Sequence, residues 1–119
     1  MNSVEKGRKG EDKAASFLEG EGYRIVRRNF RAYGSEIDIV AVKDSTTVFA
    51  EVKYWNALGF DQMERALDGK KRAGIVRASK AFLLRYPVFS SNSIRYDLIY
   101  LCDSGENPKH VMNAFTETN

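Results

Sequence analysis

The sequence predicts one α/β domain spanning residues 1–119, in which helices flank a mixed four-stranded sheet in the order α-β-β-β-α-β. Three observations predict it. The chain of 119 residues is long enough for one hydrophobic core and too short for two. Its 43% hydrophobic and 29% charged residues are typical of a globular protein. Segments with strand periodicity also alternate with two segments of helical periodicity. We expect a core over about residues 4–102 and a tail over 103–119 that docks through 110–115.

Two segments have helical periodicity. In residues 4–20, small and apolar side chains form one stripe, and Gly22 follows as a helix terminator. The second helix is predicted from about residue 63 to residue 85, since Pro87 cannot continue a helix. This helix crosses over between the third and fourth strands, so it delivers the last strand parallel to its neighbour.

Alternation of apolar and polar residues predicts the strands. The polar pair Asp44-Ser45 forms a turn that makes the second and third strands an antiparallel hairpin. The four predicted strands are residues 23–32, 36–42, 47–54 and 94–102.

Charged side chains interrupt this hairpin. The turn pairs residues whose numbers sum to 89, so Asp38 is expected opposite Glu51, and Glu36 opposite Lys53. Two facing carboxylates in a half-buried sheet repel each other. A hard divalent cation between them would remove that cost, because Mg²⁺ prefers carboxylate oxygens.

Strand alternation also predicts which side chains share a face. Glu36 and Asp38 are expected on the face opposite to Ile37 and Ile39. Glu11 lies on the apolar stripe of the first helix, and we expect it to point toward the same sheet.

Two further features concern the helices. Gly7 and Gly10 are expected to let the first helix approach the sheet closely around Glu11. Lys71 occupies a similar position on the apolar stripe of the second helix. The alternative for both charged residues is that their side chains extend to water at the edge of the stripe.

The net charge of +3 conceals two basic segments, at 24–35 and 70–96, on either side of an acidic centre. This pattern suits a polyanion held by its phosphates around a metal site. The alternative is that these cations solvate exposed faces. The candidate phosphate contacts are Arg24, Arg27, Arg28, Arg31, Lys70, Lys71, Arg72 and Arg77, with Trp55 as a candidate for stacking on an unpaired base.

Some classes of protein are disfavoured. The single cysteine, Cys102, cannot form an internal disulfide, and the single histidine, His110, rules out a zinc site with two histidines. Asp97 is expected to be structural, bound to Arg95 or to backbone amides. No apolar run approaches the roughly 20 residues that span a membrane, and the N-terminus has no apolar signal stretch. We therefore expect a cytoplasmic protein that does not enter a membrane.

Asp38 followed by Glu51-Val52-Lys53 resembles the PD-(D/E)xK nuclease motif, and the predicted element order is similar to the core of that superfamily. More narrowly, the chain resembles the YraN-like family of small bacterial endonuclease-like proteins. The segments that carry this resemblance are GRKGEDKAASFL, RRNFRAYGSEIDIVA, FAEVKYW and IRYDLIYL. Ser35 departs from the glycine that usually precedes Glu-Ile-Asp in that family.

The resemblance implies a restriction-endonuclease-like fold and a metal-dependent nuclease that hydrolyses DNA phosphodiester bonds, on branched or damaged structures. It implies that Glu11, Asp38 and Glu51 hold Mg²⁺ or Mn²⁺ and that Lys53 completes the catalytic set. Lys53 would orient the attacking water or stabilise the charge on the phosphate. Glu36 and Lys71 would have supporting roles.

A second class of function remains open. The same fold without useful turnover would be a nucleic-acid-binding or partner-binding module. The intact set of Asp38, Glu51 and Lys53 favours the nuclease, because a binding module has no need of three costly polar groups in its sheet. The expected partners are DNA, including branched or single-stranded DNA, and a second copy of the chain in a homodimer.

Overall fold

The computed structural model describes the backbone of residues 3–55, 67–102 and 107–117, and the side chains of 7–53, 67–101 and 107–117. The side chain of Trp55 and the predicted helix start at residue 63 lie outside the described residues. The elements are α1 (Ser3–Gly20), β1 (Arg24–Ala32), β2 (Ser35–Lys43), β3 (Thr46–Trp55), α3 (Gly69–Arg85), the 3-10 turn η1 (Pro87–Phe89), β4 (Ser93–Cys102) and β5 (Lys109–Phe115).

The strands form one five-stranded mixed sheet in the order β1-β2-β3-β4-β5. The predicted parallel crossover is confirmed, since β4 runs parallel to β3 while the other neighbours are antiparallel. The predicted number of four strands is wrong. The docking element of the tail is a fifth strand, β5, which pairs with β4 and covers what would otherwise be an open edge.

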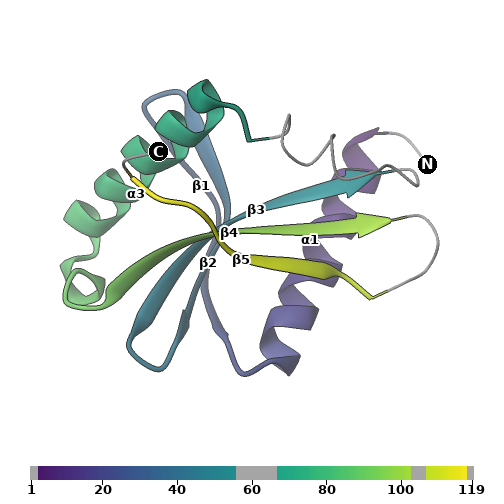
Figure 1. The fold of residues 1–119 in the computed structure, drawn as a ribbon, viewed down its shortest axis with the longest axis horizontal. Helices are drawn as coiled ribbons and strands as arrows, with labels where there is room; N and C mark the ends of the chain where they lie inside the picture. The colour runs from purple at the N-terminus through teal and green to yellow at the C-terminus, as the bar shows by residue number, and fades with distance from the viewer. Residues whose placement is uncertain (1–2, 56–66, 103–106, 118–119) are drawn as a thin grey trace.

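The two helices lie on opposite sides of the sheet (Figure 1). Below α3, Phe82 packs with Phe30 and Phe49 in one cluster of buried side chains. Below α1, Leu18 packs with Ile39 in a second cluster. The strands β1 to β4 therefore contribute side chains to both cores, whereas β5 contributes to the first. No helix in the described part of the chain is long and apolar enough to span a membrane.

The helix ends follow local chemistry. Gly22 adopts a φ of 93° after α1, which matches the predicted termination. Helix α3 ends at Arg85, before Pro87, also as predicted. It begins only at Gly69, because the Asp68 side chain caps it by accepting a hydrogen bond from the Lys71 N–H at 2.9 Å. Helical periodicity alone did not reveal this cap.

Gly74 lets α3 approach the start of β2. A Cβ at this buried position would overlap the Ser35 side chain, whose Cβ would lie 3.3 Å away. The absence of a side chain at residue 74 therefore sets the distance between the helix and the strand that carries Glu36 and Asp38.

Asp97 holds the β4–β5 edge together. Its buried carboxylate accepts hydrogen bonds from the Arg95 guanidinium and from the Asn113 N–H, and it lies 2.7 Å from the Nε2 atom of His110. Burial alone would raise the pKa of Asp97, but the hydrogen bonds from His110, Arg95 and Asn113 bring it below its ordinary value. The predicted structural role of Asp97 is confirmed, and His110 serves the same network.

Asp97→Ala should lower the free energy of unfolding by about 3–5 kcal/mol, because it leaves the guanidinium of Arg95 without its buried partner. The matched control is Asp12→Ala, which removes an exposed partner of Arg28 and should cost less than about 1 kcal/mol. Urea unfolding of both variants measures the difference. Equal losses would contradict the role assigned to Asp97.

Candidate active site

The site forms where the β2–β3 ladder ends. The predicted register is confirmed from Lys43 and Thr46 at the turn to Ile39 and Ala50. The two expected pairs beyond this point, Asp38 with Glu51 and Glu36 with Lys53, are not part of the ladder. Beyond Ile39 and Ala50, the Val52 N–H donates a hydrogen bond to Oδ2 of Asp38 at 2.8 Å. A side-chain carboxylate thus takes the place of a ladder carbonyl, and the two strands separate there.

The alternation of β2 is interrupted at Asp38. Ile37 belongs to the core cluster that contains Phe82 of α3, whereas Ile39 belongs to the cluster below α1. The prediction that Ile37 and Ile39 share one face is therefore wrong.

The neighbouring strand explains this change of face. Asn29 in β1 has a φ of 53°, in the left-handed region that asparagine tolerates better than most residues. On either side of it, Arg28 pairs with Ile39 and Phe30 pairs with Ile37. One left-handed residue therefore rotates β1, and β2 follows at the level of Asp38.

The separated strands open a cleft of about 310 Å³ that brings together the six residues predicted for the catalytic and supporting roles. Gly7 and Gly10 form part of its wall. A Cβ at Gly7 would meet no atom within 4 Å, so close helix packing does not require glycine there, contrary to the expectation. The lining residues are Gly7, Gly10, Glu11, Glu36, Asp38, Glu51, Val52, Lys53 and Lys71.

Three of the four acids form the tightest group. One carboxylate oxygen from each of Glu11, Glu36 and Asp38 lies within 4.8 Å of the others. Glu36 was predicted only as a supporting residue. Its spacing of two from Asp38 on one strand is the signal that identifies it.

Glu51 is placed differently from these three. It is only 3% exposed, and its Oε1 atom lies 3.1 Å from Nζ of Lys53 and 3.3 Å from Nζ of Lys71. Its Oε2 atom is buried and has no hydrogen-bond partner among the described residues. One oxygen of Glu51 is thus shared by two ammonium groups, while the other accepts no hydrogen bond from the described residues.

Glu11 also has an unsatisfied oxygen. Its Oε1 atom is buried without a hydrogen-bond partner among the described residues, and the nearest cation, NH2 of Arg28, lies 3.6 Å away. Burial raises the pKa of Glu11, and the charge of Glu36 raises it further, although Asn29 and Arg28 oppose both effects.

Asp38 has the most strongly shifted pKa of the acids in the cleft. Burial, followed by the negative charge of Glu51, raises the pKa of Asp38 to about 8. The hydrogen bond from Val52 opposes this rise without cancelling it. The carboxyl group of Asp38 is therefore held in a place that disfavours its charge, unless a cation compensates.

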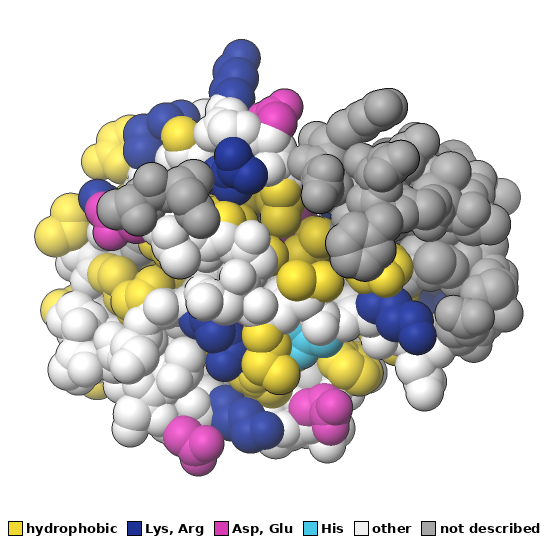
Figure 2. Space-filling view, viewed as in Figure 1, with side chains coloured by type: hydrophobic (Ala, Val, Ile, Leu, Met, Phe, Trp, Pro, Cys, Tyr) yellow, Lys and Arg dark blue, Asp and Glu magenta, His cyan; other side chains and the backbone are white. Residues whose placement is uncertain are grey.

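The arginines of β1 do not form one surface. Arg27 donates to the hydroxyl of Tyr86 on the α3 side, and Arg28 donates to Asp12 of α1 on the other side. Arg31 forms an ion pair with Glu36 at 2.8 Å, and Arg24 is exposed. On the face shown in Figure 2, Lys and Arg side chains are scattered rather than gathered in one patch.

The cations of α3 are more concentrated. Lys70 and Arg77 are exposed and have no acidic partner among the described residues. Arg72 is partly buried, with an unpartnered Nε atom, and Lys71 reaches into the cleft. Among the described residues, α3 therefore offers Lys70 and Arg77 as cations without an acidic partner, in a cavity that shares Glu36 and Lys71 with the cleft.

The raised pKa of Asp38 predicts how stability depends on pH without metal. Between about pH 4 and pH 8 the folded state keeps a proton that the unfolded chain loses, so stability falls as the pH rises. Asp38→Asn removes this titration and keeps an oxygen that can accept the Val52 N–H. It should raise stability near neutral pH by about 0.5–2 kcal/mol in EDTA and flatten the pH dependence.

Thermal melts of both proteins from pH 4 to pH 8, in EDTA and in Mn²⁺, measure this effect. Glu11 is present in both proteins, so their difference reports the charge of Asp38 together with its repulsion from Glu51 and Glu11. In Mn²⁺ the advantage of the variant should shrink or reverse, because wild type gains ligand-linked stability. A variant that melts lower by the same margin in both buffers would show that Asp38 is only a structural partner.

Comparison with known proteins places the chain in a family. The model of "Uncharacterised protein family UPF0102" matches residues 10–101, which include all the lining acids and lysines of the cleft. A UPF0102 protein of Persephonella marina is 37% identical over 97% of this chain and 97% of its own length. A UPF0102 protein of Geobacter sulfurreducens is 39% identical over 92% of this chain and 87% of its own. The chain therefore belongs to the uncharacterised protein family UPF0102, the YraN family that its motifs resemble.

Proposed function

We propose that the protein is a metal-dependent nuclease that hydrolyses DNA phosphodiester bonds. The observation that carries this proposal is a pair of buried carboxylate oxygens, Oε1 of Glu11 and Oε2 of Glu51, in one cleft with Asp38. Neither oxygen has a hydrogen-bond partner among the described residues. Buried polar atoms normally have hydrogen-bond partners. Two such atoms among four acids indicate a site built for a cation.

The donor set fits Mg²⁺ or Mn²⁺. Glu11, Glu36 and Asp38 offer hard oxygen ligands within 4.8 Å of one another, and Glu51 adds an unpartnered oxygen in the same cleft. We assign the metal to this set. When bound, such an ion lowers the pKa of a coordinated water and neutralises charge on a phosphate.

The lysines complete the chemistry from two directions. Lys53 follows Glu51 by two residues on β3, and Lys71 reaches the same Glu51 oxygen from α3. Either ammonium group is within reach of a phosphate oxygen held in the cleft. Lys53 would orient the attacking water or stabilise the negative charge that develops on the phosphate. Lys71 would hold Glu51 in place and bind the substrate.

The charge distribution supports a polyanionic substrate. Glu36 of the cleft also lines a neighbouring cavity with Lys70 and Arg77, which have no acidic partner among the described residues. Phosphate contacts of this kind hold a nucleic acid in position without reading its sequence. We therefore propose DNA, including branched or single-stranded DNA, as the substrate.

The fold is compatible with this proposal. The predicted order α-β-β-β-α-β is present in α1, β1, β2, β3, α3 and β4, and β5 adds an edge strand. Asp38 lies at the end of the β2–β3 ladder, and Glu51 and Lys53 lie on β3, as the PD-(D/E)xK resemblance implies. We propose a restriction-endonuclease-like core on this basis.

Asp38→Ala, Glu51→Ala and Lys53→Ala should each abolish Mn²⁺-dependent cleavage and leave DNA binding within about threefold of wild type, since phosphate contacts supply most of the affinity. Glu19→Ala changes an exposed carboxylate on α1 and is the matched control. The assay uses labelled single-stranded, duplex, flapped and four-way DNA in Mg²⁺, Mn²⁺ or EDTA.

Equal cleavage by wild type and all the variants would identify a contaminating nuclease and refute the proposal. DNA binding by wild type without cleavage of any substrate would instead support the alternative, a nucleic-acid-binding module.

A further inference from the structure

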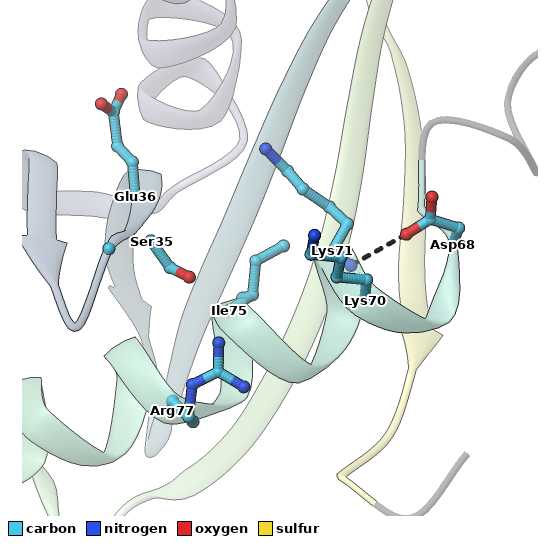
Figure 3. Close-up of a pocket in the computed structure, with 8 residues that line it drawn as sticks. Ser35, Glu36, Asp68, Lys70, Lys71, Ile75 and Arg77 are labelled. Carbon is cyan, nitrogen blue, oxygen red and sulfur yellow. Dashed lines mark hydrogen bonds between the residues drawn. The ribbon is translucent and has the colours of Figure 1, made fainter.

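A second cavity adjoins the carboxylate cleft. It has a volume of about 500 Å³ and shares Glu36 and Lys71 with the cleft. This volume falls within the range of about 300–1,000 Å³ that is typical of small-ligand sites. Figure 3 shows Lys70, Lys71 and Arg77 entering it from α3, opposite the start of β2.

The acids of this cavity are already committed. The Asp68 carboxylate caps α3, and Glu36 is paired with Arg31 at 2.8 Å. Lys70 and Arg77 have no acidic partner in the described part of the chain. They are seven residues apart on one helix, which separates them by about 10 Å along the axis. The cavity therefore retains two free cations for an anionic ligand.

An exposed aromatic residue is the direct chain neighbour of a residue that lines the cavity. Tyr33 precedes Gly34, which lines the cavity, and the two form the turn between β1 and β2 with φ values of 53° and 74°. The left-handed conformation is unfavourable for tyrosine. Asparagine or glycine would adopt it more easily. Tyr33 is 74% exposed, and its ring takes part in none of the aromatic or cation–π pairs among the described residues. The fold thus gains nothing evident from an aromatic side chain in this strained position.

We propose that this cavity and Tyr33 form a subsite for single-stranded nucleic acid next to the carboxylate cleft. Lys70 and Arg77 bind the phosphates that flank the one held at the carboxylates. Tyr33 stacks on an unpaired base. This inference rests on the proposed function, because it takes the carboxylate cleft as the place of the phosphate to be cleaved.

The chemistry favours an unpaired strand over a duplex. Bases in a duplex already stack on one another, whereas an unpaired base presents its face to an aromatic ring. The tip of a two-residue turn reaches such a base without a groove around it. The substrate class is therefore DNA that has unpaired nucleotides beside the cleavage position, such as a flap or a single-stranded end.

The test uses a fluorescein-labelled single-stranded oligonucleotide and a matched duplex, with binding measured by anisotropy in EDTA. Tyr33→Asn removes the ring and suits the left-handed turn, so loss of binding without loss of melting temperature cannot be attributed to unfolding. It should weaken single-strand binding about 5- to 100-fold, as expected for one base–aromatic stack, and leave duplex binding unchanged. Tyr33→Phe should bind like wild type.

A single-stranded oligonucleotide that contains 2-aminopurine reports the stack directly. Wild type and Tyr33→Phe should quench its fluorescence, and Tyr33→Asn should not. Lys70→Gln combined with Arg77→Gln should reduce the slope of log K against log salt by about 1.4 for the single strand. Arg85→Gln, at the other end of α3, is the control and should leave the slope unchanged.

Because binding is measured without metal, this test does not depend on catalysis. Cleavage that requires Asp38 but is insensitive to Tyr33→Asn would overturn the subsite and leave the nuclease. Tyr33-dependent binding without any cleavage would uphold the subsite and refute the nuclease. Single-strand binding by Tyr33→Asn that equals wild type would overturn the subsite directly.

Discussion

The hydrogen bond from the Val52 N–H to the Asp38 carboxylate determines the shape of the site. In a regular β2–β3 ladder, a backbone carbonyl of β2 would accept the hydrogen bond from the Val52 N–H. Because the Asp38 carboxylate accepts it instead, this N–H of β3 keeps a hydrogen-bond partner although β2 diverges. A regular ladder at this level would close the gap between the strands. The cleft is thus a consequence of how one sheet pairing ends, and the acids around it occupy the space that the missing pairing leaves.

Four structural elements must come together before the site exists, and β2 supplies Glu36 and Asp38. Glu51 and Lys53 are local to β3, but Lys71 comes from α3 and Glu11 from α1, on the other side of the sheet. The buried carboxylate of Glu51 gains the second of its two ammonium partners only when α3 is docked, because Lys71 lies on that helix while Lys53 is local to β3. Formation of the site is therefore linked to completion of both hydrophobic cores.

The parts of this arrangement that depend on local chemistry follow from the sequence. The turn at Asp44-Ser45 determines the hairpin register, and Gly22 and Pro87 mark where helices stop. The change of face at Asp38 does not follow, because it depends on the left-handed conformation of Asn29 in another strand.

Long-range partners explain the other differences. The fifth strand forms because Asp97 accepts from Asn113 and lies beside His110, contacts between segments that sequence periodicity cannot relate. Glu36 shares a strand face with Asp38, as its spacing predicts, but the approach of Glu11 to both depends on how α1 docks on the sheet.

The contact between Gly74 and Ser35 limits which pairs of residues can occupy these two positions in relatives of this protein. The space between α3 and β2 holds one small side chain, and in this protein Ser35 fills it. A relative with glycine at position 35 has room for alanine at position 74, and one with a larger residue at 35 needs glycine at 74. The two positions should therefore covary in size across an alignment, even though 39 residues separate them in the chain.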